Sequence, residues 1–256
     1  MKTVLLSGSP KKRLSVSGFL LKAAALFFGG EKLFVTIPTA PSRYGPILDE
    51  MKDADNLLFA MPLYVDAVPG HVLSFMQALE TFAKEENFRP RVYVIANNGF
   101  IEGRQNAPFM TIMENFSAAS SFSFMGGLGI GGGVMLNVIR ILLPLQFLMM
   151  LLTIFLTYVG EGQWIIREPV ENFLLNLLIN GALASATFYY IISLARHIRR
   201  QEDFGKKYTR ILLPAFVFIV VADVFFFIVS LLQGGLFRGW LAKKKPTDAF
   251  LRRRID

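Results

Sequence analysis

The first half of the chain alternates short apolar runs with longer stretches of helical periodicity. Five short apolar or β-branched runs, each ending near Pro, Gly or Asn, lie at residues 3–6, 33–37, 56–60, 91–96 and 121–125. Between them, apolar residues recur at helical spacing at residues 19–28, 47–54, 70–84 and 105–116. Strands that alternate with helices predict an α/β fold with a doubly wound parallel sheet of five strands. Such a sheet binds its ligands at the carboxyl ends of the strands.

The second half carries three long apolar runs, at about residues 138–160, 173–195 and 211–233. Each is long enough to cross a bilayer core, which takes about 20 apolar residues as a helix. Buried helices of a soluble domain are the alternative. The runs contain hardly any charge, however, and this favours the membrane.

The chain is therefore expected to have three parts. These are an α/β domain at residues 1–133, an all-α transmembrane region at 134–237 and a basic tail at 238–256. Polar residues within the apolar runs suit contacts between helices inside the membrane. They include Asn176 and Asn180, and also Asp223, which is either a functional residue or the partner of a nearby Asn or Ser.

Composition and charge agree with this division. The chain is 53% hydrophobic and has a mean hydropathy of +0.46, which is high for a soluble protein. Its formal net charge of +8 is concentrated in clusters beside the apolar runs. That placement favours anionic lipid head groups as partners and argues against nucleic acid. The absence of Cys excludes disulfides, iron–sulfur clusters and thiol catalysis, and nothing at the N-terminus resembles a signal peptide.

The distribution of Lys and Arg predicts the topology. With the α/β domain in the cytosol, the first run delivers residues 161–171, where only Arg167 is basic, to the outside. The second run returns a basic cluster to the inside: Arg196, Arg199, Arg200, Lys206, Lys207 and Arg210. A third full crossing would export the basic tail. Either the third run is re-entrant or interfacial, or the tail is an exception, and the side of the C-terminus stays open.

The loop after the first predicted strand, residues 7–17, is rich in hydroxyl and basic side chains. Because a helix follows it, the loop combines the N–H groups of a helix N-terminus with Ser hydroxyls and cations. That combination suits a bound phosphate. The alternative is an ordinary strand-to-helix turn in which a Ser caps the helix.

Three loops in register resemble the flavodoxin-like family, in its branch of NAD(P)H-dependent FMN reductases and multimeric flavodoxins. They contain Gly8-Ser9-Pro10-Lys11, Pro62-Leu63-Tyr64 and Asn97-Asn98-Gly99, each after a predicted strand. The resemblance covers about residues 1–133 and implies the strand order 2-1-3-4-5. The interleaved Leu14 and Val16 depart from the family pattern.

The resemblance implies an FMN cofactor that is reduced by NADPH or NADH. For the phosphate it implies Ser9, Lys11, Ser15 and Ser17. For the isoalloxazine ring it implies Pro62, Leu63, Tyr64, Val65, Asn97, Asn98, Gly99 and Phe100. The flavin carries the chemistry in this family, so no catalytic side chain and no metal are expected.

A glycine-rich stretch, residues 126–133, contains a formal GxGxxG match from Gly127 to Gly132. It follows the last predicted strand, and no βαβ unit comes after it, so a dinucleotide fingerprint is not expected. We expect instead a flexible loop near the flavin.

The sequence thus predicts a multi-pass protein of the cell membrane with a cytoplasmic flavin domain. It would pass electrons from NAD(P)H to a small-molecule acceptor, for which a quinone is one candidate, and a homo-oligomer is compatible with it. Two alternatives stay open. One is a non-catalytic flavodoxin-like module that senses or regulates a membrane partner, and the other is an FMN electron carrier without a nicotinamide site.

Overall fold

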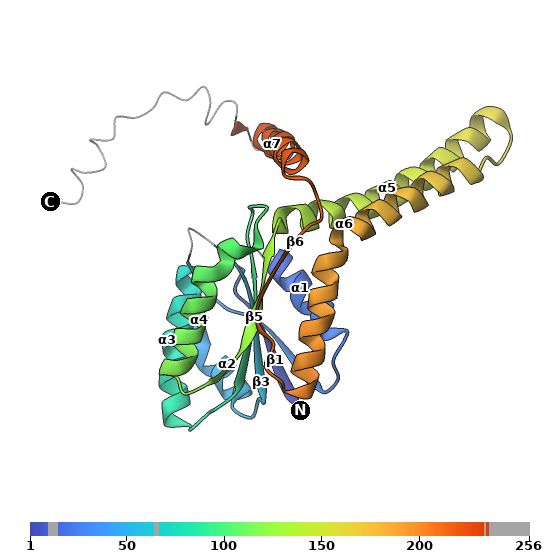
Figure 1. Ribbon diagram of the computed structural model, residues 1–256. Coiled ribbons are helices and arrows are strands. Elements are labelled where there is room, and N and C mark those ends of the chain that lie inside the picture. The colour runs from blue at the N-terminus through green and yellow to red at the C-terminus, as the bar shows by residue number, and fades with distance from the viewer. Residues whose placement is uncertain (10–14, 64–66, 233, 236–256) are drawn as a thin grey trace, which may run out of the picture. The chain divides into compact units, whose positions relative to one another are not determined.

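The computed structural model describes residues 1–9, 15–63, 67–232 and 234–235 (Figure 1). The chain forms two compact units, Met1–Leu212 and Leu213–Asp256. The predicted division after residue 133 falls inside the first unit.

The first unit is built on a parallel sheet of six strands in the order β2-β1-β3-β4-β5-β6. The strands are β1 (Lys2–Ser7), β2 (Glu31–Thr36), β3 (Asn56–Pro62), β4 (Arg91–Asn97), β5 (Ser123–Gly131) and β6 (Gly205–Arg210). The first five confirm the predicted order 2-1-3-4-5. The predicted number of five strands is wrong, because β6 joins the sheet beside β5 from the half of the chain that was expected to be all-helical.

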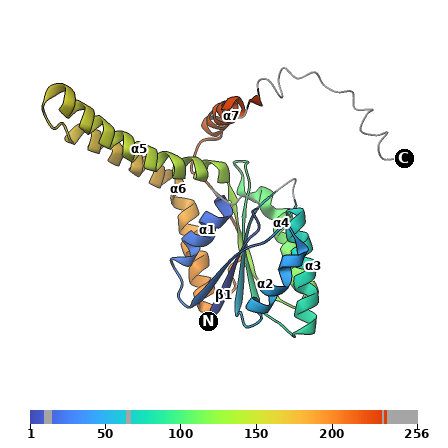
Figure 2. The ribbon, with the colours of Figure 1, turned by 180° about the vertical axis from the view of Figure 1, so that it is seen from behind.

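Helices cover both faces of the sheet (Figures 1 and 2). On one face lie α2 (Tyr44–Met51), α3 (Gly70–Glu85) and α4 (Ala107–Ala119), and on the other lie α1 (Val16–Ala25) and the C-terminal part of α6 (Arg167–Arg200). Two short helices, η1 (Pro41–Arg43) and η2 (Gly103–Asn106), lie in loops. The apolar face predicted for α3 is confirmed, since Val72, Phe75 and Leu79 are fully buried.

The sequence of the sixth strand lacks the apolar run that identifies the other strands. Gly-Lys-Lys-Tyr-Thr-Arg has no apolar run, and its Lys206 and Lys207 are exposed at the edge of the sheet. Charged residues on an edge strand prevent pairing with another chain, so they are typical of such an edge. Lys206 also forms an ion pair with Glu114 of α4.

The glycine-rich stretch is not a flexible loop. Residues 126–131 belong to β5 and are largely buried. The glycines allow backbones to approach one another: a Cβ on Gly129 would lie 3.0 Å from the Gly103 carbonyl oxygen, and Gly126 has a φ of +99° directly against Gly205 of β6. The sheet can add η2 and β6 at this edge because Gly126, Gly129 and Gly131 carry no side chain at these close approaches.

Two long helices form a hairpin that continues beyond the sheet. They are α5 (Gly133–Glu161), of 29 residues, and α6, of 34 residues, and they lie side by side in both views. Phe147 of α5 packs edge-to-face on Phe173 of α6, and Tyr158 stacks on Trp164 at the tip. At 1.5 Å per residue, α5 is about 44 Å long.

The two ends of α6 lie in different environments. Leu174, Leu177 and Leu178 are exposed in the hairpin, whereas Ile191, Leu194 and other residues between 184 and 198 are buried against the sheet. The second predicted apolar run, 173–195, therefore spans both parts. Its C-terminal part covers the sheet of the α/β domain.

The C-terminal end of α6 is anchored to the sheet by Tyr93 of β4. The buried Tyr93 hydroxyl donates to the Glu202 carbonyl at 3.0 Å, and the His197 carbonyl oxygen lies 3.4 Å from the same hydroxyl. Burial raises the pKa of this phenol to about 12, because it disfavours the phenolate. The turn that leads into β6 is thereby held against the middle of the sheet.

The second unit contains α7 (Ala215–Leu232), which is almost wholly apolar. Asp223 lies near its middle and is exposed within this unit. Among the described residues, α5, α6 and α7 are three helices long and apolar enough to cross a membrane.

The two environments of α6 predict different costs for the same substitution. Ile191→Ala should lower the free energy of unfolding by about 2–5 kcal/mol, because it leaves a cavity in a closed core. Ile179→Ala in the hairpin, where the side chain is 49% exposed, is the control and should change it by less than about 0.5 kcal/mol. Thermal unfolding of both variants in detergent measures this, and equal shifts would contradict the division of α6.

Candidate functional site

The candidate site lies where β1 and β3 end side by side. The connections from these two strands run to opposite sides of the sheet, which opens a crevice at their carboxyl ends. Gly8 leaves β1 so close to its neighbours that a Cβ would lie 2.8 Å from the Met61 Cβ and 2.9 Å from a Val72 methyl. Only glycine therefore allows the first loop to start here.

The first loop uses two of its predicted serines internally. Ser15 is the N-cap of α1, and its hydroxyl oxygen accepts from the Gly18 N–H at 3.1 Å, as the capping alternative expects. Ser17 is 1% exposed and donates to the Asn97 side-chain oxygen at 2.9 Å. Ser9 is also buried, and Lys11 lies outside the described residues.

The second loop begins at Pro62, the last residue of β3, and continues into the partly buried Leu63. The Leu63 N–H donates to the Asn97 carbonyl at 2.9 Å, so this loop and the loop after β4 start together. Tyr64 and Val65, which were predicted to contact the ring, lie outside the described residues.

The third loop contributes two buried amides. Asn97 and Asn98 are 6% and 3% exposed. The Asn98 side-chain N–H donates to the Glu102 carbonyl at 3.1 Å, while its side-chain oxygen is buried without a hydrogen-bond partner in the described structure. Such an orphaned acceptor fits a ligand N–H. Phe100, which was predicted to contact the ring, is 60% exposed.

Hydrogen bonds thus join the three predicted loops. Ser17 reaches Asn97 across β3, Leu63 binds the backbone of Asn97, and Gly133 donates to the Asn98 carbonyl at 2.8 Å. The last of these bonds comes from the first residue of α5. The start of the hairpin is therefore part of the same edge of the sheet.

Arg140 of α5 is a residue of this site that the sequence analysis did not identify. Its guanidinium donates to the Ser15 carbonyl at 3.3 Å and lies 5.3 Å from the centre of the Phe19 ring. In the sequence, Arg140 is an interruption near the start of an apolar run. That isolated charge was the available signal, but nothing in the sequence shows which loop it meets.

A hollow of about 360 Å³ lies beside α1, between β1, β2 and Arg140. Its polar residues are Ser7 and Thr36 at the ends of β1 and β2, Ser15 and Lys22 of the α1 segment, and Arg140. Its apolar wall includes Leu5, Leu21, Phe34 and Val35. The lining therefore combines two cations and three hydroxyls with an apolar wall.

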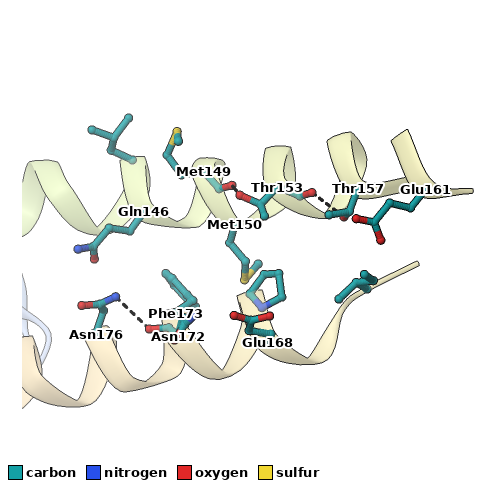
Figure 3. A pocket seen from close by; sticks show the side chains of 13 residues that line it. Gln146, Met149, Met150, Thr153, Thr157, Glu161, Glu168, Asn172, Phe173 and Asn176 are labelled. Carbon is teal, nitrogen blue, oxygen red and sulfur yellow. Dashed lines mark hydrogen bonds between the residues drawn. The ribbon is translucent and has the colours of Figure 1, made fainter. Parts of the chain in front are cut away.

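A second hollow, of about 540 Å³, lies between the two helices of the hairpin (Figure 3). Polar side chains from both helices line it: Gln146, Thr153, Thr157, Glu161, Glu168, Asn172 and Asn176. Several donors are used within their own helix. Thr153 donates to the Met149 carbonyl at 2.9 Å, and Asn176 to the Asn172 carbonyl at 3.0 Å. The groove thus concentrates the polar residues of an otherwise apolar hairpin.

Comparisons with known proteins give distant likenesses only. No protein-family model and no curated protein matches the chain. An NADPH-quinone reductase from P. pentosaceus is 15% identical with a TM-score of 0.44, over 52% of this chain and 86% of that one. The Trp repressor binding protein from Bacillus subtilis is 19% identical with a TM-score of 0.42, over 51% and 84%. An azoreductase from Bacillus anthracis is 12% identical with a TM-score of 0.39, over 52% and 87%.

These TM-scores are below 0.5, so the likenesses carry no argument about this chain. The case for its site rests on the strand order and on the bonds between the three loops.

The bond between Ser17 and Asn97 should stabilise the site measurably. Ser17→Ala should lower the free energy of unfolding by about 1–3 kcal/mol, because it leaves the buried Asn97 oxygen without its donor. Ser74→Ala is the matched control, since Ser74 is exposed and bonds only within its own helix. Thermal unfolding of both variants tests this, and a cost for Ser17→Ala no larger than the control's would contradict it.

Proposed function

We propose that this chain is a membrane-anchored, flavodoxin-like oxidoreductase that binds FMN and transfers electrons from NADPH or NADH. The observation that carries the proposal is the meeting of three loops at the carboxyl ends of the neighbouring strands β1, β3 and β4. Doubly wound sheets bind ligands in a crevice at these ends, and in flavodoxin, whose sheet has the order 2-1-3-4-5, the ligand there is FMN. The glycine at the start of the first loop and the buried amides of the third loop support the same site.

The described residues fit the cofactor. The first loop would hold the phosphate, with Ser9 and the N-terminal turn of α1 as partners. The flat ring would lie against Leu63 and the 97–99 segment, where the orphaned Asn98 oxygen can accept from a ring N–H. The roles predicted for Lys11, Tyr64 and Val65 stay predictions, since these residues lie outside the described ones.

When bound, FMN would supply the redox chemistry, which is the acceptance of a hydride from the nicotinamide. The residues of this chain bind and orient it. The Ser17–Asn97 bond fixes the distance between the phosphate loop and the ring loops, and the buried backbone around Gly8 keeps water from one side of the crevice. Because the flavin carries the reaction, no side chain is assigned as an acid or base.

The hairpin is the proposed membrane anchor. The exposed leucines of α5 and α6 would face lipid, and the polar groove between the helices would be shielded from it. The tip, residues 161–166, would then lie outside the cell. Arg196, Arg199 and Arg200, at the end of α6 that packs on the sheet, would lie in the cytoplasm.

The proposed electron acceptor is a small molecule, and a quinone is the first candidate. A tethered flavin meets bilayer-soluble acceptors at a high effective concentration. A homo-oligomer is compatible with this arrangement.

One observation favours a second candidate, a non-catalytic flavodoxin-like module that regulates a membrane partner. The hydroxyls of Ser15 and Ser17 are both engaged within the protein. If these bonds persist, the loop has fewer groups for a phosphate. An FMN carrier without a nicotinamide site is the third candidate.

The visible spectrum separates these candidates. We expect the full chain, purified in detergent and reconstituted with FMN, to show the absorption bands of bound flavin and to lose them on anaerobic addition of NADPH or NADH. A protein that cannot be reconstituted supports the regulatory module. A bound flavin that neither nucleotide bleaches supports the carrier.

The absence of Cys allows a direct test of the anchor. Gln163→Cys at the hairpin tip should be labelled by a membrane-impermeant maleimide on intact cells, because the tip is proposed to be external. Ser74→Cys, at an exposed position of α3, is the control and should be labelled only after lysis. Labelling of residue 163 only after lysis would contradict the proposed topology.

A further inference from the structure

We propose that Arg140, supplied by the membrane hairpin, binds a phosphate monoester in the hollow beside α1. The proposal rests on the proposed function, since the phosphate would belong to FMN or to the 2′-position of NADPH. It adds to the site a residue from outside the three loops. It also makes the anchor a direct part of ligand binding.

The guanidinium has an uncompensated charge. Arg140 is half-buried, and within the described part of the chain no carboxylate lies within ion-pair distance of it. Its one hydrogen bond there goes to the Ser15 carbonyl, although a guanidinium carries five N–H donors. A partly buried cation with spare donors is stabilised by an anion, because the anion replaces the hydrogen bonds and the charge screening that water provides to an exposed cation.

The hollow has the chemistry of an anion site. Its described lining contains two cations, Arg140 and Lys22, and no carboxylate. Hydroxyl groups of Ser7, Ser15 and Thr36 line it as well. Ser15, the N-cap of α1, is one of these lining residues, so the dipole of α1 adds to the positive potential in the hollow.

The geometry holds the guanidinium in place. Arg140 stacks over Phe19 of α1 at 5.3 Å, and Phe19 packs edge-to-face on Phe188 of α6 at 6.3 Å between ring centres. Both helices of the hairpin therefore fix the position of the charge. One guanidinium N–H donates to the Ser15 carbonyl, and the other N–H donors are available for two parallel bonds to phosphate oxygens, which a lysine could not form.

The test compares ligands with and without the phosphate. The dissociation constants of FMN and riboflavin are measured by flavin fluorescence in detergent for the wild type, for Arg140→Gln and for Arg140→Lys. We expect Arg140→Gln to weaken FMN about tenfold to hundredfold and to leave riboflavin unchanged. The FMN dissociation constant of Arg140→Lys should lie between those of the wild type and of Arg140→Gln. Arg196→Gln removes the same charge from α6, away from the hollow, and should change neither dissociation constant.

A second arm identifies the source of the phosphate. NADPH and NADH are compared in the same variants by the rate at which they bleach the flavin. If Arg140→Gln loses affinity for FMN but not for riboflavin, the hollow belongs to the cofactor. If it loses bleaching rate with NADPH but not with NADH, the hollow belongs to the nucleotide. Equal losses for all four ligands overturn the proposal, because they would show that Arg140 only supports the fold. Lys22→Gln repeats the test from the exposed side of the hollow if Arg140→Gln does not fold.

The outcome stays separate from that of the proposed function. If the wild type binds neither FMN nor riboflavin, the proposed cofactor is wrong. Inorganic phosphate alone is then added to the wild type and to Arg140→Gln, and the rise in melting temperature that it causes is compared. A smaller rise in the variant supports the anion site, and an equal rise overturns it.

Discussion

The structure depends on the burial of the C-terminal part of α6 against the sheet. A parallel sheet must be covered on both faces, and α1 covers only part of one of them. Ile191, Leu194 and Ile198 cover the remainder, and Tyr93 fixes the end of their helix. The α/β domain is therefore completed only after the chain has passed through the hairpin and returned. Hairpin and sheet form one compact unit for this reason.

This order of assembly brings the hairpin to the candidate site. Since α5 starts directly after β5, its first turns lie over the loops at the carboxyl ends of the strands, where Gly133 binds Asn98 and Arg140 reaches Ser15. In a two-domain protein joined by a linker, the anchor and the site would be independent. Here a shift of the hairpin would also move the Arg140 charge beside the loop after β1.

Much of the α/β domain could be predicted from the sequence. Strands with continuous apolar runs, such as residues 56–60, and the periodic face of α3 were identified because both are buried on an apolar surface. The three loops were found because Gly, Ser and Asn are required at sharp, polar strand ends. Strand β6 was missed, since a basic edge strand carries no apolar signal, and β5 was predicted too short because its glycines resemble a loop.

The sequence by itself determined the local elements, the strand order implied by three loop motifs and the presence of three apolar segments long enough for a membrane. Only the tertiary structure decided that one of those segments is shared between the hairpin and the core, and that Arg140 lies beside Ser15, 125 residues earlier in the chain. The reason is physical. Periodicity records which residues avoid water, but burial against lipid and burial against protein leave the same apolar pattern. The partner of an isolated charge is fixed by packing between distant segments, which no local pattern records.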